Sequence, residues 1–463
     1  MPIAFARLSD PNRRPKWLLS ISCIALTFVW GPSRAEAPPA QTQVIGSGDA
    51  AIAARSVEAP ELGRPGDFAV GTRRIALDEP ARPMLSAPGY QAGHVTLGAT
   101  LFYPTLPNDG PREVYQHSTS RPQGKVYTIT ETGLAHADVP VVPGHRFPLV
   151  VVSHGYGGWS THFSRILELV ASHGYVVASI DHEDLPHDDV AAFFASFGNV
   201  LVERAADQRT AIADLLALAR VGQGVLGAVN PEAPIGLIGY SMGGYGATAT
   251  AGAVYDPAAH PLATIPQTGR DALARPDPET AAKVGALVLI APWGAQPDNR
   301  MWTPAAVNAI TAPTLLIDGD QDDVVNYHDG VRWLFDHMTS ADRRLLTFHG
   351  ARHNLAGNAV TLAADAPEDV VGWFTDPVWR QERLNQLAAH FITAFLDASL
   401  RQDAGHRAFL EVPTVESDAG SWPIAFGAQT GARRSGAGEP GYWRGFARGT
   451  AAGMALEHKE KGK

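Results

Sequence analysis

Residues 235–247 read IGLIGYSMGGYGA, and this stretch decides the fold that we expect. The apolar run 235–239 is typical of a buried strand, and the small residues from Gly244 onward suit a helix that packs closely against it. Ser241 lies in the turn between the two, flanked by glycines in the pattern G-x-S-x-G. Such a turn exposes a serine hydroxyl at the end of a strand and is too tight for larger flanking side chains. Ser241 is therefore the candidate nucleophile.

A turn upstream of this serine offers the backbone groups that a nucleophile needs. Residues 149–152 form an apolar strand and are followed by SHGYGG. A His-Gly-x-Gly turn at this place directs backbone N–H groups at the oxygen that becomes negative when a carbonyl is attacked, and each donor is worth about 3 kcal/mol. We expect the N–H groups of Tyr156 and Met242 to form this oxyanion hole. His154 is interpreted as a residue that braces the turn.

An acidic run follows the strand expected at 314–317. Residues 318–323 read DGDQDD, so four carboxylates compete for one role. A carboxylate that orients a histidine must lie beyond the end of the strand and turn toward the histidine loop. The Gly-x-x-Asp spacing favours Asp322. The other acids lie close to the strand end or suit solvated and turn-capping positions.

The candidate base follows the next expected strand, residues 345–348, which runs into HGARHN. His353 lies on the loop beyond this strand, so it can reach between Ser241 and Asp322. His349 lies at the strand end and is interpreted as a partly buried residue. The candidate catalytic set is therefore Ser241, Asp322 and His353, with His353 as the general base.

Strands and helices alternate through most of the chain. This alternation predicts an α/β fold with a mostly parallel central sheet and helices on both faces. Pro-rich insertions interrupt it near 255–283, 293–312 and 354–379. The expected strands are 73–77, 94–103, 147–153, 175–180, 235–239, 286–290, 314–317 and 345–348. The expected helices are 162–172, 200–220, 244–253, 329–338 and 381–400.

The remaining segments are assigned by composition. Residues 1–37 predict a signal peptide, because a basic patch precedes an uncharged run of 14 residues and a small-x-small cleavage pattern ends near Ala37. The run is too short for a transmembrane anchor, so we expect a secreted or periplasmic protein. Residues 38–71 predict a flexible lead-in, residues 72–400 the catalytic domain, and residues 401–463 a C-terminal extension that either adds a hairpin or is partly disordered.

The overall composition excludes several classes of protein. The chain of 463 residues has a net charge of −10, which disfavours binding to a nucleic-acid backbone. Its single cysteine, Cys23, lies inside the predicted signal peptide and excludes both a disulfide scaffold and a cysteine-based metal site. The chemistry proposed above needs no cofactor. We expect the partner to be an ester substrate, which is a small molecule, a lipid or a polyester.

Three weaker signals leave alternatives open. The segment 182–189, HEDLPHDD, is interpreted as a solvated loop at the rim of the sheet, with a calcium or zinc site as the alternative. Residues 190–202 predict a buried helix, with a mobile lid as the alternative. Trp159 and Trp293 are candidate substrate-binding residues that line the cleft, although each suits the core equally well.

The chain resembles the α/β-hydrolase superfamily over residues 72–400. In that superfamily the serine, the acid and the histidine follow one another along the chain in the same order as Ser241, Asp322 and His353. The segment VVVSHGYGGWSTHFSRILELVASHGYVVASIDHED, together with GLIGYSMGGYGA and TLLIDGDQDDVV, resembles the branch of platelet-activating-factor acetylhydrolases and dienelactone-hydrolase-like proteins. The same segments, with Ala-Pro-Trp at 291–293, are also similar to bacterial cutinases, which are polyester hydrolases. Dienelactone hydrolases themselves use a cysteine, which Ser241 rules out here.

The resemblance implies the hydrolysis of carboxylic esters through an acyl-enzyme, and the predicted signal peptide adds the expectation that this serine hydrolase is exported. It does not fix which ester. A peptidase or thioesterase on the same scaffold is one alternative, and a binding protein that keeps the serine turn without turnover is another. The oligomeric state stays open.

Overall fold

The structure is a computed structural model of the chain. It describes residues 42–46, 58–77, 82–86, 89–93, 97–119, 127–184, 190–362, 366, 368–422 and 441–463. The predicted signal peptide and residues 185–189 of the acidic loop lie outside the described residues.

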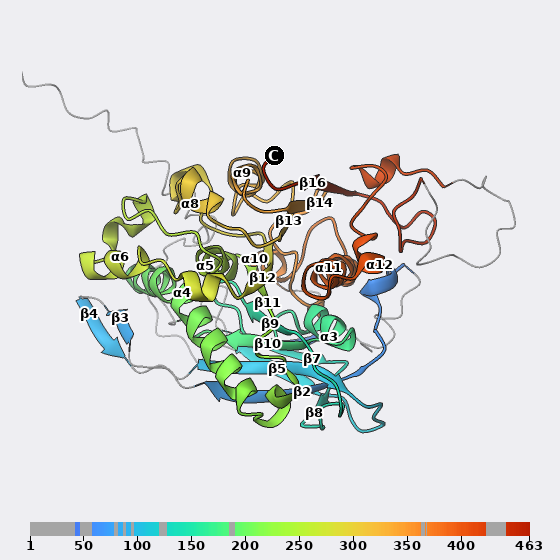
Figure 1. The fold of residues 1–463 in the computed structure, drawn as a ribbon. Coiled ribbons are helices and arrows are strands. Elements are labelled where there is room, and N and C mark those ends of the chain that lie inside the picture. Colours follow the sequence, from blue (N-terminus) through green and yellow to red (C-terminus); the bar gives the residue numbers. More distant parts are fainter. Residues whose placement is uncertain are drawn as a thin grey trace, which may run out of the picture.

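A ten-stranded sheet forms the centre of the molecule (Figure 1). In spatial order its strands are β16-β14-β13-β12-β11-β9-β10-β5-β2-β8, and those from β10 to β14 are all parallel to one another. The α/β-hydrolase fold class expected from the sequence is thus confirmed. The bounds are β2 (Ala69–Leu77), β5 (Leu97–Thr105), β8 (His136–Ala137), β9 (Leu149–Ser153), β10 (Val176–Asp181), β11 (Ile235–Tyr240), β12 (Val284–Ile290), β13 (Thr314–Gly319), β14 (Arg343–Phe348) and β16 (Met454–Lys459).

Helices cover both faces of this sheet. Helices α3 and α11 pack together on one face, whereas α4 and α5 pack together on the other (Figure 1). The α-helices are α3 (Ser164–Ser172), α4 (Val190–Arg220), α5 (Met242–Thr250), α6 (Gln267–Leu273), α7 (Pro278–Ala281), α8 (Pro304–Asn308), α9 (Arg332–His337), α10 (Glu368–Phe374), α11 (Gln381–Leu396) and α12 (Ala404–Arg407). The short 3-10 or π turns are η1 (Glu61–Gly63), η2 (Gly224–Ala228), η3 (His260–Thr264), η4 (Pro297–Asn299), η5 (Tyr327–Val331), η6 (Asp397–Arg401) and η7 (Ser417–Ala419).

Burial on both faces explains the apolar runs in the central strands. Every residue of β9, β11, β13 and β14 is buried. A parallel strand sandwiched between two layers of helices has no solvent face, so its side chains do not alternate between apolar and polar. The central strands therefore form the core.

Smaller elements surround the main sheet. A four-stranded sheet has the order β15-β1-β7-β6, and a separate hairpin pairs β3 with β4. Their bounds are β1 (Thr42–Gly46), β3 (Arg82–Ser86), β4 (Gly89–Gly93), β6 (Val114–Thr119), β7 (Tyr127–Thr132) and β15 (Val360–Thr361). In the part of the chain that the structure describes, no helix is both long and apolar enough to cross a membrane.

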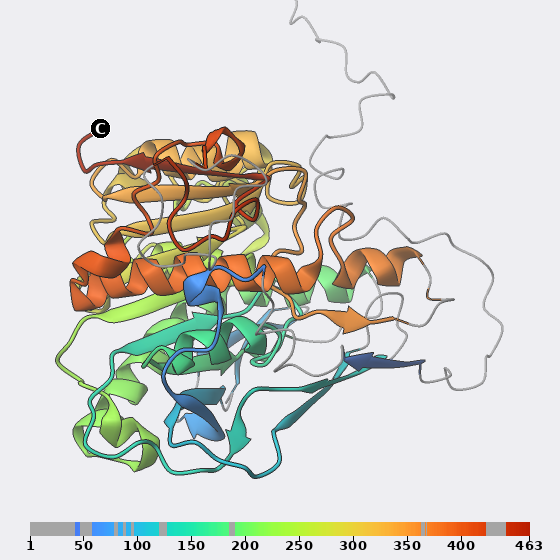
Figure 2. The ribbon, with the colours of Figure 1, turned by 90° about the vertical axis from the view of Figure 1, so that its right-hand side faces the viewer.

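Both segments that flank the predicted catalytic domain contribute to its packing. At the end of the expected lead-in, η1 packs against α11, where Leu62 N–H donates to His390 Nδ1 at 3.1 Å (Figure 2). In the C-terminal extension, β16 pairs antiparallel with β14 along its whole length. Trp443 and Phe446 are buried against Phe391 of α11. Apolar contacts thus hold residues that composition alone assigned to loose segments.

The long helix α4 joins two segments that the sequence presents separately. Residues 190–202, expected as a buried helix or a lid, form its first turns and continue directly into the helix expected at 200–220. Phe193 is buried, whereas Phe194 is exposed. The helix therefore begins with an amphipathic end and becomes mostly buried further along.

Candidate active site

The turn at Ser241 has the geometry that the glycine pattern predicts. Ser241 caps α5 with φ 51° and ψ −115°, a left-handed conformation that residues with a Cβ rarely adopt. A Cβ at Gly239 would lie 2.3 Å from the carbonyl oxygen of Gly243, and a Cβ at Gly243 would lie 2.0 Å from that of Ser153. Only glycine fits at these two positions, because backbone atoms occupy the space that a side chain would need.

The structure brings Ser241, Asp322 and His353 together. His353 Nε2 lies 3.1 Å from Ser241 Oγ, and His353 Nδ1 lies 2.7 Å from Asp322 Oδ2. The three residues follow strands β11, β13 and β14, which run parallel and therefore end at the same edge of the sheet. The serine hydroxyl, imidazole and carboxylate form one hydrogen-bonded line.

Asp322 is held as a carboxylate. Its Oδ1 accepts hydrogen bonds from the N–H groups of Val324 at 2.8 Å and Val325 at 3.2 Å. Burial alone would raise the pKa of Asp322, but the neighbouring His353 and the backbone N–H of Val325 outweigh it and leave the pKa below its usual range. Asp322 can therefore orient the imidazole and balance a positive charge on it.

The other acids of the run lie elsewhere. Asp318 is fully buried at the end of β13, and burial together with the charge of Asp322 raises its pKa well above the usual value. Asp320 accepts from the N–H of Gly350 at 2.7 Å, and Asp323 pairs with Arg352 at 3.1 Å. Neither of these two contacts involves the ring of His353.

His349 faces other partners than Ser241. Its Nδ1 lies 2.9 Å from Asp320 Oδ2, and its Nε2 lies 2.8 Å from Glu416 Oε2. These carboxylates raise the pKa of His349 above its usual value against the opposing effect of burial. His349 therefore links the end of β14 to the C-terminal extension.

The predicted oxyanion segments lie on either side of the serine. A Cβ at Gly155 would come within 3.1 Å of the Cβ of Ser241, so the loop after β9 passes directly beside the turn. Met242 is the first residue of α5, where a backbone N–H has no acceptor within the helix. The side chain of Tyr156 points away toward α4 and donates to Ser196 Oγ at 2.8 Å.

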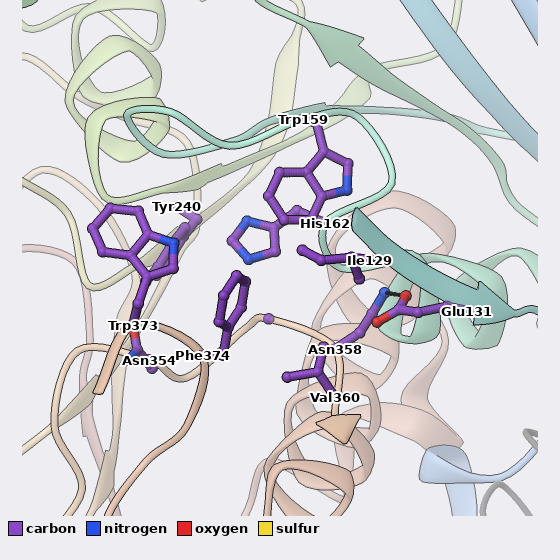
Figure 3. Close-up of a pocket in the computed structure, with 11 residues that line it drawn as sticks. Ile129, Glu131, Trp159, His162, Tyr240, Asn354, Asn358, Val360, Trp373 and Phe374 are labelled. Atoms are coloured by element: carbon purple, nitrogen blue, oxygen red, sulfur yellow. Dashed lines mark hydrogen bonds between the residues drawn. The ribbon is translucent and has the colours of Figure 1, made fainter. Parts of the chain in front are cut away.

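A small cavity adjoins this site (Figure 3). Tyr240 and Asn354, which are the chain neighbours of Ser241 and His353, contribute to its wall. The ring of Trp159 lies in a stack between His117 and His162 at centroid distances of 4.0 and 4.3 Å. The remaining lining residues are mostly apolar and come from β7, the 354–360 segment and α10: Ile129, Glu131, Gly357, Asn358, Val360, Trp373 and Phe374.

The two candidate substrate-binding tryptophans occupy different places. Trp159 lines the cavity in Figure 3. Trp293 is buried on the α4 side, where its ring packs against Phe197 and Tyr245 and its backbone N–H donates to the carbonyl of Ser241 at 3.1 Å. Trp293 therefore supports the serine turn from behind.

The start of the acidic loop differs from the expectation. Instead of belonging to a solvated rim, His182 is buried, and Asp184 accepts from the N–H of Gly157 at 2.6 Å and pairs with Arg204 at 2.7 Å. Among the described residues, no group of three or more His, Cys, Asp or Glu side chains could hold a metal ion. The buried partners of this loop lie on α4, which the local sequence does not reveal.

Sequence reasoning also missed polar residues that line the cavity. Glu131 and Asn358 form a hydrogen-bonded pair at one end of it (Figure 3). Burial raises the pKa of Glu131 to about 8, although Asn358 opposes this effect. Both residues lie in segments without a recognisable motif, so only the folded chain brings them together.

The fold is that of an α/β-hydrolase, and two family matches support the assignment of the chain to that superfamily. Within it, residues 123–201 match the family described as platelet-activating factor acetylhydrolase, isoform II. Residues 297–359, which include Asp322 and His353, match the family described as serine aminopeptidase, S33.

Individual relatives are similar to short parts of the chain. Platelet-activating factor acetylhydrolase of Cavia porcellus is 28% identical over 99 residues, which cover 18% of this chain and 23% of that protein. The enzyme of that name from Canis lupus familiaris is 44% identical over 50 residues, or 11% of each chain. That from Gallus gallus is 38% identical over 58 residues, or 12% and 14%. The chain thus spans less than a quarter of the length of these relatives.

Proposed function

We propose that the protein is a serine hydrolase that cleaves carboxylic esters through an acyl-enzyme. The observation that carries the proposal is the hydrogen-bonded line from Ser241 through His353 to Asp322. A serine hydroxyl is a weak nucleophile until an adjacent base takes its proton, and the 3.1 Å between His353 Nε2 and Ser241 Oγ supports that role for His353. The similarity to proteins named platelet-activating factor acetylhydrolase supports an ester as the substrate.

The reaction proceeds in two halves. His353 Nε2 removes the proton of Ser241 as Oγ attacks the ester carbonyl, and Asp322 stabilises the resulting imidazolium through Nδ1. The N–H groups of Tyr156 and Met242 hold the developing oxyanion. The intermediate then expels the alcohol, which takes the proton from His353. A water molecule, activated by the same histidine, releases the acid and restores Ser241.

The cavity beside the site is the proposed binding place for one side of the ester. Its wall contains Trp159 and Phe374, which favour an apolar group. Small-molecule, lipid and polyester substrates all offer such a group. Trp293 as a second substrate-binding residue stays a prediction.

A peptidase is the second candidate, because residues 297–359 match the serine aminopeptidase family. That match includes Asp322 and His353 but does not include Ser241 or the oxyanion loop. The acetylhydrolase match, in contrast, includes the loop. We therefore favour the ester. A chain-length series of nitrophenyl esters, measured beside peptide anilides and thioesters, separates the candidates by kcat/KM.

The decisive test is Ser241→Ala. We expect turnover of the best nitrophenyl ester to fall by roughly 10⁶, because the nucleophile is lost while the fold is kept. A fluorophosphonate probe should label the unmodified protein at Ser241 and leave Ser241→Ala unlabelled. Near-normal esterase activity in the variant would refute the assignment, and an unlabelled parent protein would indicate a binding protein without turnover.

Export is part of the proposal. It rests on the sequence of residues 1–37, and we expect the mature chain to begin after Ala37 in the periplasm or the medium. N-terminal sequencing of the protein recovered from those fractions tests this. An intact N-terminus on protein found only inside the cell would contradict it.

A further inference from the structure

A second line of serine, histidine and aspartate lies behind the oxyanion loop. His182 Nε2 is 2.7 Å from Ser153 Oγ, and His182 Nδ1 is 2.6 Å from Asp207 Oδ2. These three residues, which we call the buried relay, end β9, follow β10 and lie within α4. Their exposed fractions are 0% for Ser153, 6% for His182 and 2% for Asp207. A hydroxyl with no exposed surface cannot attack a substrate, so the buried relay needs another role.

We propose that the buried relay positions the oxyanion loop, residues 154–158, and thereby aims the N–H of Tyr156 at the reacting carbonyl oxygen. The inference rests on the proposed function, since it assigns the relay to the same reaction. His182 and Asp207 are positioning residues, because they act through the loop and do not touch the substrate. Three sets of contacts carry the argument.

The first set leads from His182 to the loop. The backbone N–H of His182 donates to His154 Nε2 at 3.1 Å, and His154 Nδ1 lies 2.7 Å from the carbonyl oxygen of Gly155. A carbonyl only accepts, so Nδ1 carries the proton and His154 is neutral. Burial, aided by the charge of Arg204, lowers the pKa of His154 and keeps this form. His182 thus holds the ring of His154, which in turn holds the carbonyl of Gly155, the residue immediately before Tyr156.

The second set holds the residue immediately after Tyr156. Gly157 N–H donates to Asp184 Oδ2 at 2.6 Å, and both oxygens of Asp184 accept from Arg204 Nη2 at 2.7 and 3.0 Å. Arg204 lies on α4 one turn before Asp207 and is itself buried. The peptide groups on either side of Tyr156 are therefore tied to the same helix and to the end of β10.

The third set joins the loop to the serine turn. Gln208, the neighbour of Asp207 on α4, donates from Nε2 to the carbonyl of Gly243 at 2.9 Å. Gly243 in turn packs closely on Ser153, since a Cβ at Gly243 would lie 2.0 Å from the carbonyl oxygen of Ser153. One helix therefore fixes both segments that carry the proposed oxyanion donors, and the relay fixes Ser153 between them.

This arrangement matters because oxyanion donors act only when they are already in place. Fixed donors need no reorganisation during the reaction, and the loss of one donor costs about 10²–10³ in kcat. A loop that loses its tether keeps the donor but no longer holds it in the productive orientation. Loosening the relay should therefore lower kcat by less than that full amount, with little effect on substrate binding in the ground state.

The experiment compares Asp207→Asn, His182→Gln and Ser153→Ala in the full chain, with a short nitrophenyl ester as substrate. We expect kcat to fall about 10- to 100-fold in the first two variants and about 3- to 10-fold in Ser153→Ala, with KM within about threefold of the unmodified protein. Affinity for a trifluoromethyl ketone, which forms a tetrahedral adduct with the serine, should fall in parallel with kcat/KM. Ser153→Ala removes one oxygen atom and is the variant least able to disturb folding.

The matched control is His390→Gln. His390 is also a buried histidine with a backbone N–H partner, but it lies on α11 across the sheet. It should lower the melting temperature without changing kcat. Folded relay variants with kcat within twofold of the parent, or a loss of stability alone as in the control, would overturn the proposal. If the fluorophosphonate fails to label the parent protein at Ser241, the proposed function falls and the relay proposal falls with it.

Discussion

The backbone of Ser241 is strained at the place where the proposed chemistry occurs. Its φ is positive, and a residue with a Cβ pays on the order of 1–3 kcal/mol for such a conformation. Its neighbours offset this cost. The N–H of Ser241 donates to Ile290 at 2.9 Å, and its carbonyl accepts from Tyr245 at 3.0 Å and Trp293 at 3.1 Å. Hydrogen bonds from two neighbouring segments thus hold the backbone of the strained turn in place.

We expect Gly243→Ala to disrupt the serine turn. The new Cβ would lie 2.0 Å from the backbone oxygen of Ser153, which cannot move without displacing β9, so the free energy of unfolding should fall by about 3 kcal/mol or more. Gly372→Ala on α10 is the control, because nothing lies within 4 Å of its Cβ position. Urea unfolding of both variants checks this. Equal stabilities would show that the close approach at Gly243 is not a constraint.

At the scale of elements, the central strands and the serine turn could be predicted from the sequence. Strands β9, β11 and β13 contain apolar runs because both of their faces are buried, and β14 contains the apolar pair Leu345–Leu346. Ser241, Asp322 and His353 each follow one of these strands. The edge strand β16 could not be predicted. Its sequence MALEHK alternates weakly, and its pairing with β14 depends on contacts with residues more than a hundred positions earlier.

Strand β16 should contribute substantially to stability. Leu456 is buried beside Leu346 of β14, so Leu456→Ala is expected to cost about 2–5 kcal/mol through lost burial and a cavity. Val221→Ala, at a position that is 74% exposed, should change stability by no more than about 0.5 kcal/mol. Thermal unfolding followed by circular dichroism measures both. A Leu456→Ala variant as stable as Val221→Ala would mean that β16 is dispensable.

At the scale of the whole molecule, contacts between distant segments explain what sequence reasoning missed. His182 stands in an acidic segment that looks solvated, and its partner Asp207 lies 25 residues further along on a helix. Glu131 and Asn358 are 227 residues apart. Periodicity and motifs describe residues that are neighbours in the chain. They locate strand ends, and therefore predict which residues come together there, but they do not reveal these polar pairs.

The Glu131–Asn358 pair predicts how stability depends on pH. The folded pKa of Glu131, about 8, lies above its ordinary value of 4.5, so the folded state retains a proton that the unfolded chain loses. The stabilising contribution is therefore present below pH 4.5 and is lost as pH rises toward 8, by at most about 1.4 kcal/mol per pH unit. We expect Glu131→Gln to remove this decline. Urea unfolding at pH 5, 7 and 9 measures it, and parallel pH profiles for the two proteins would contradict the assignment.

The pairing of β16 with β14 also has a consequence for biosynthesis. Strand β14 leads into the loop that carries His353, and it gains its second neighbour only when residues 454–459 are available. A nascent chain that has just left the ribosome as far as the histidine would still have an open sheet edge there. A chain that ends at His353 would therefore carry the proposed nucleophile while β14 still lacks one of its two neighbouring strands.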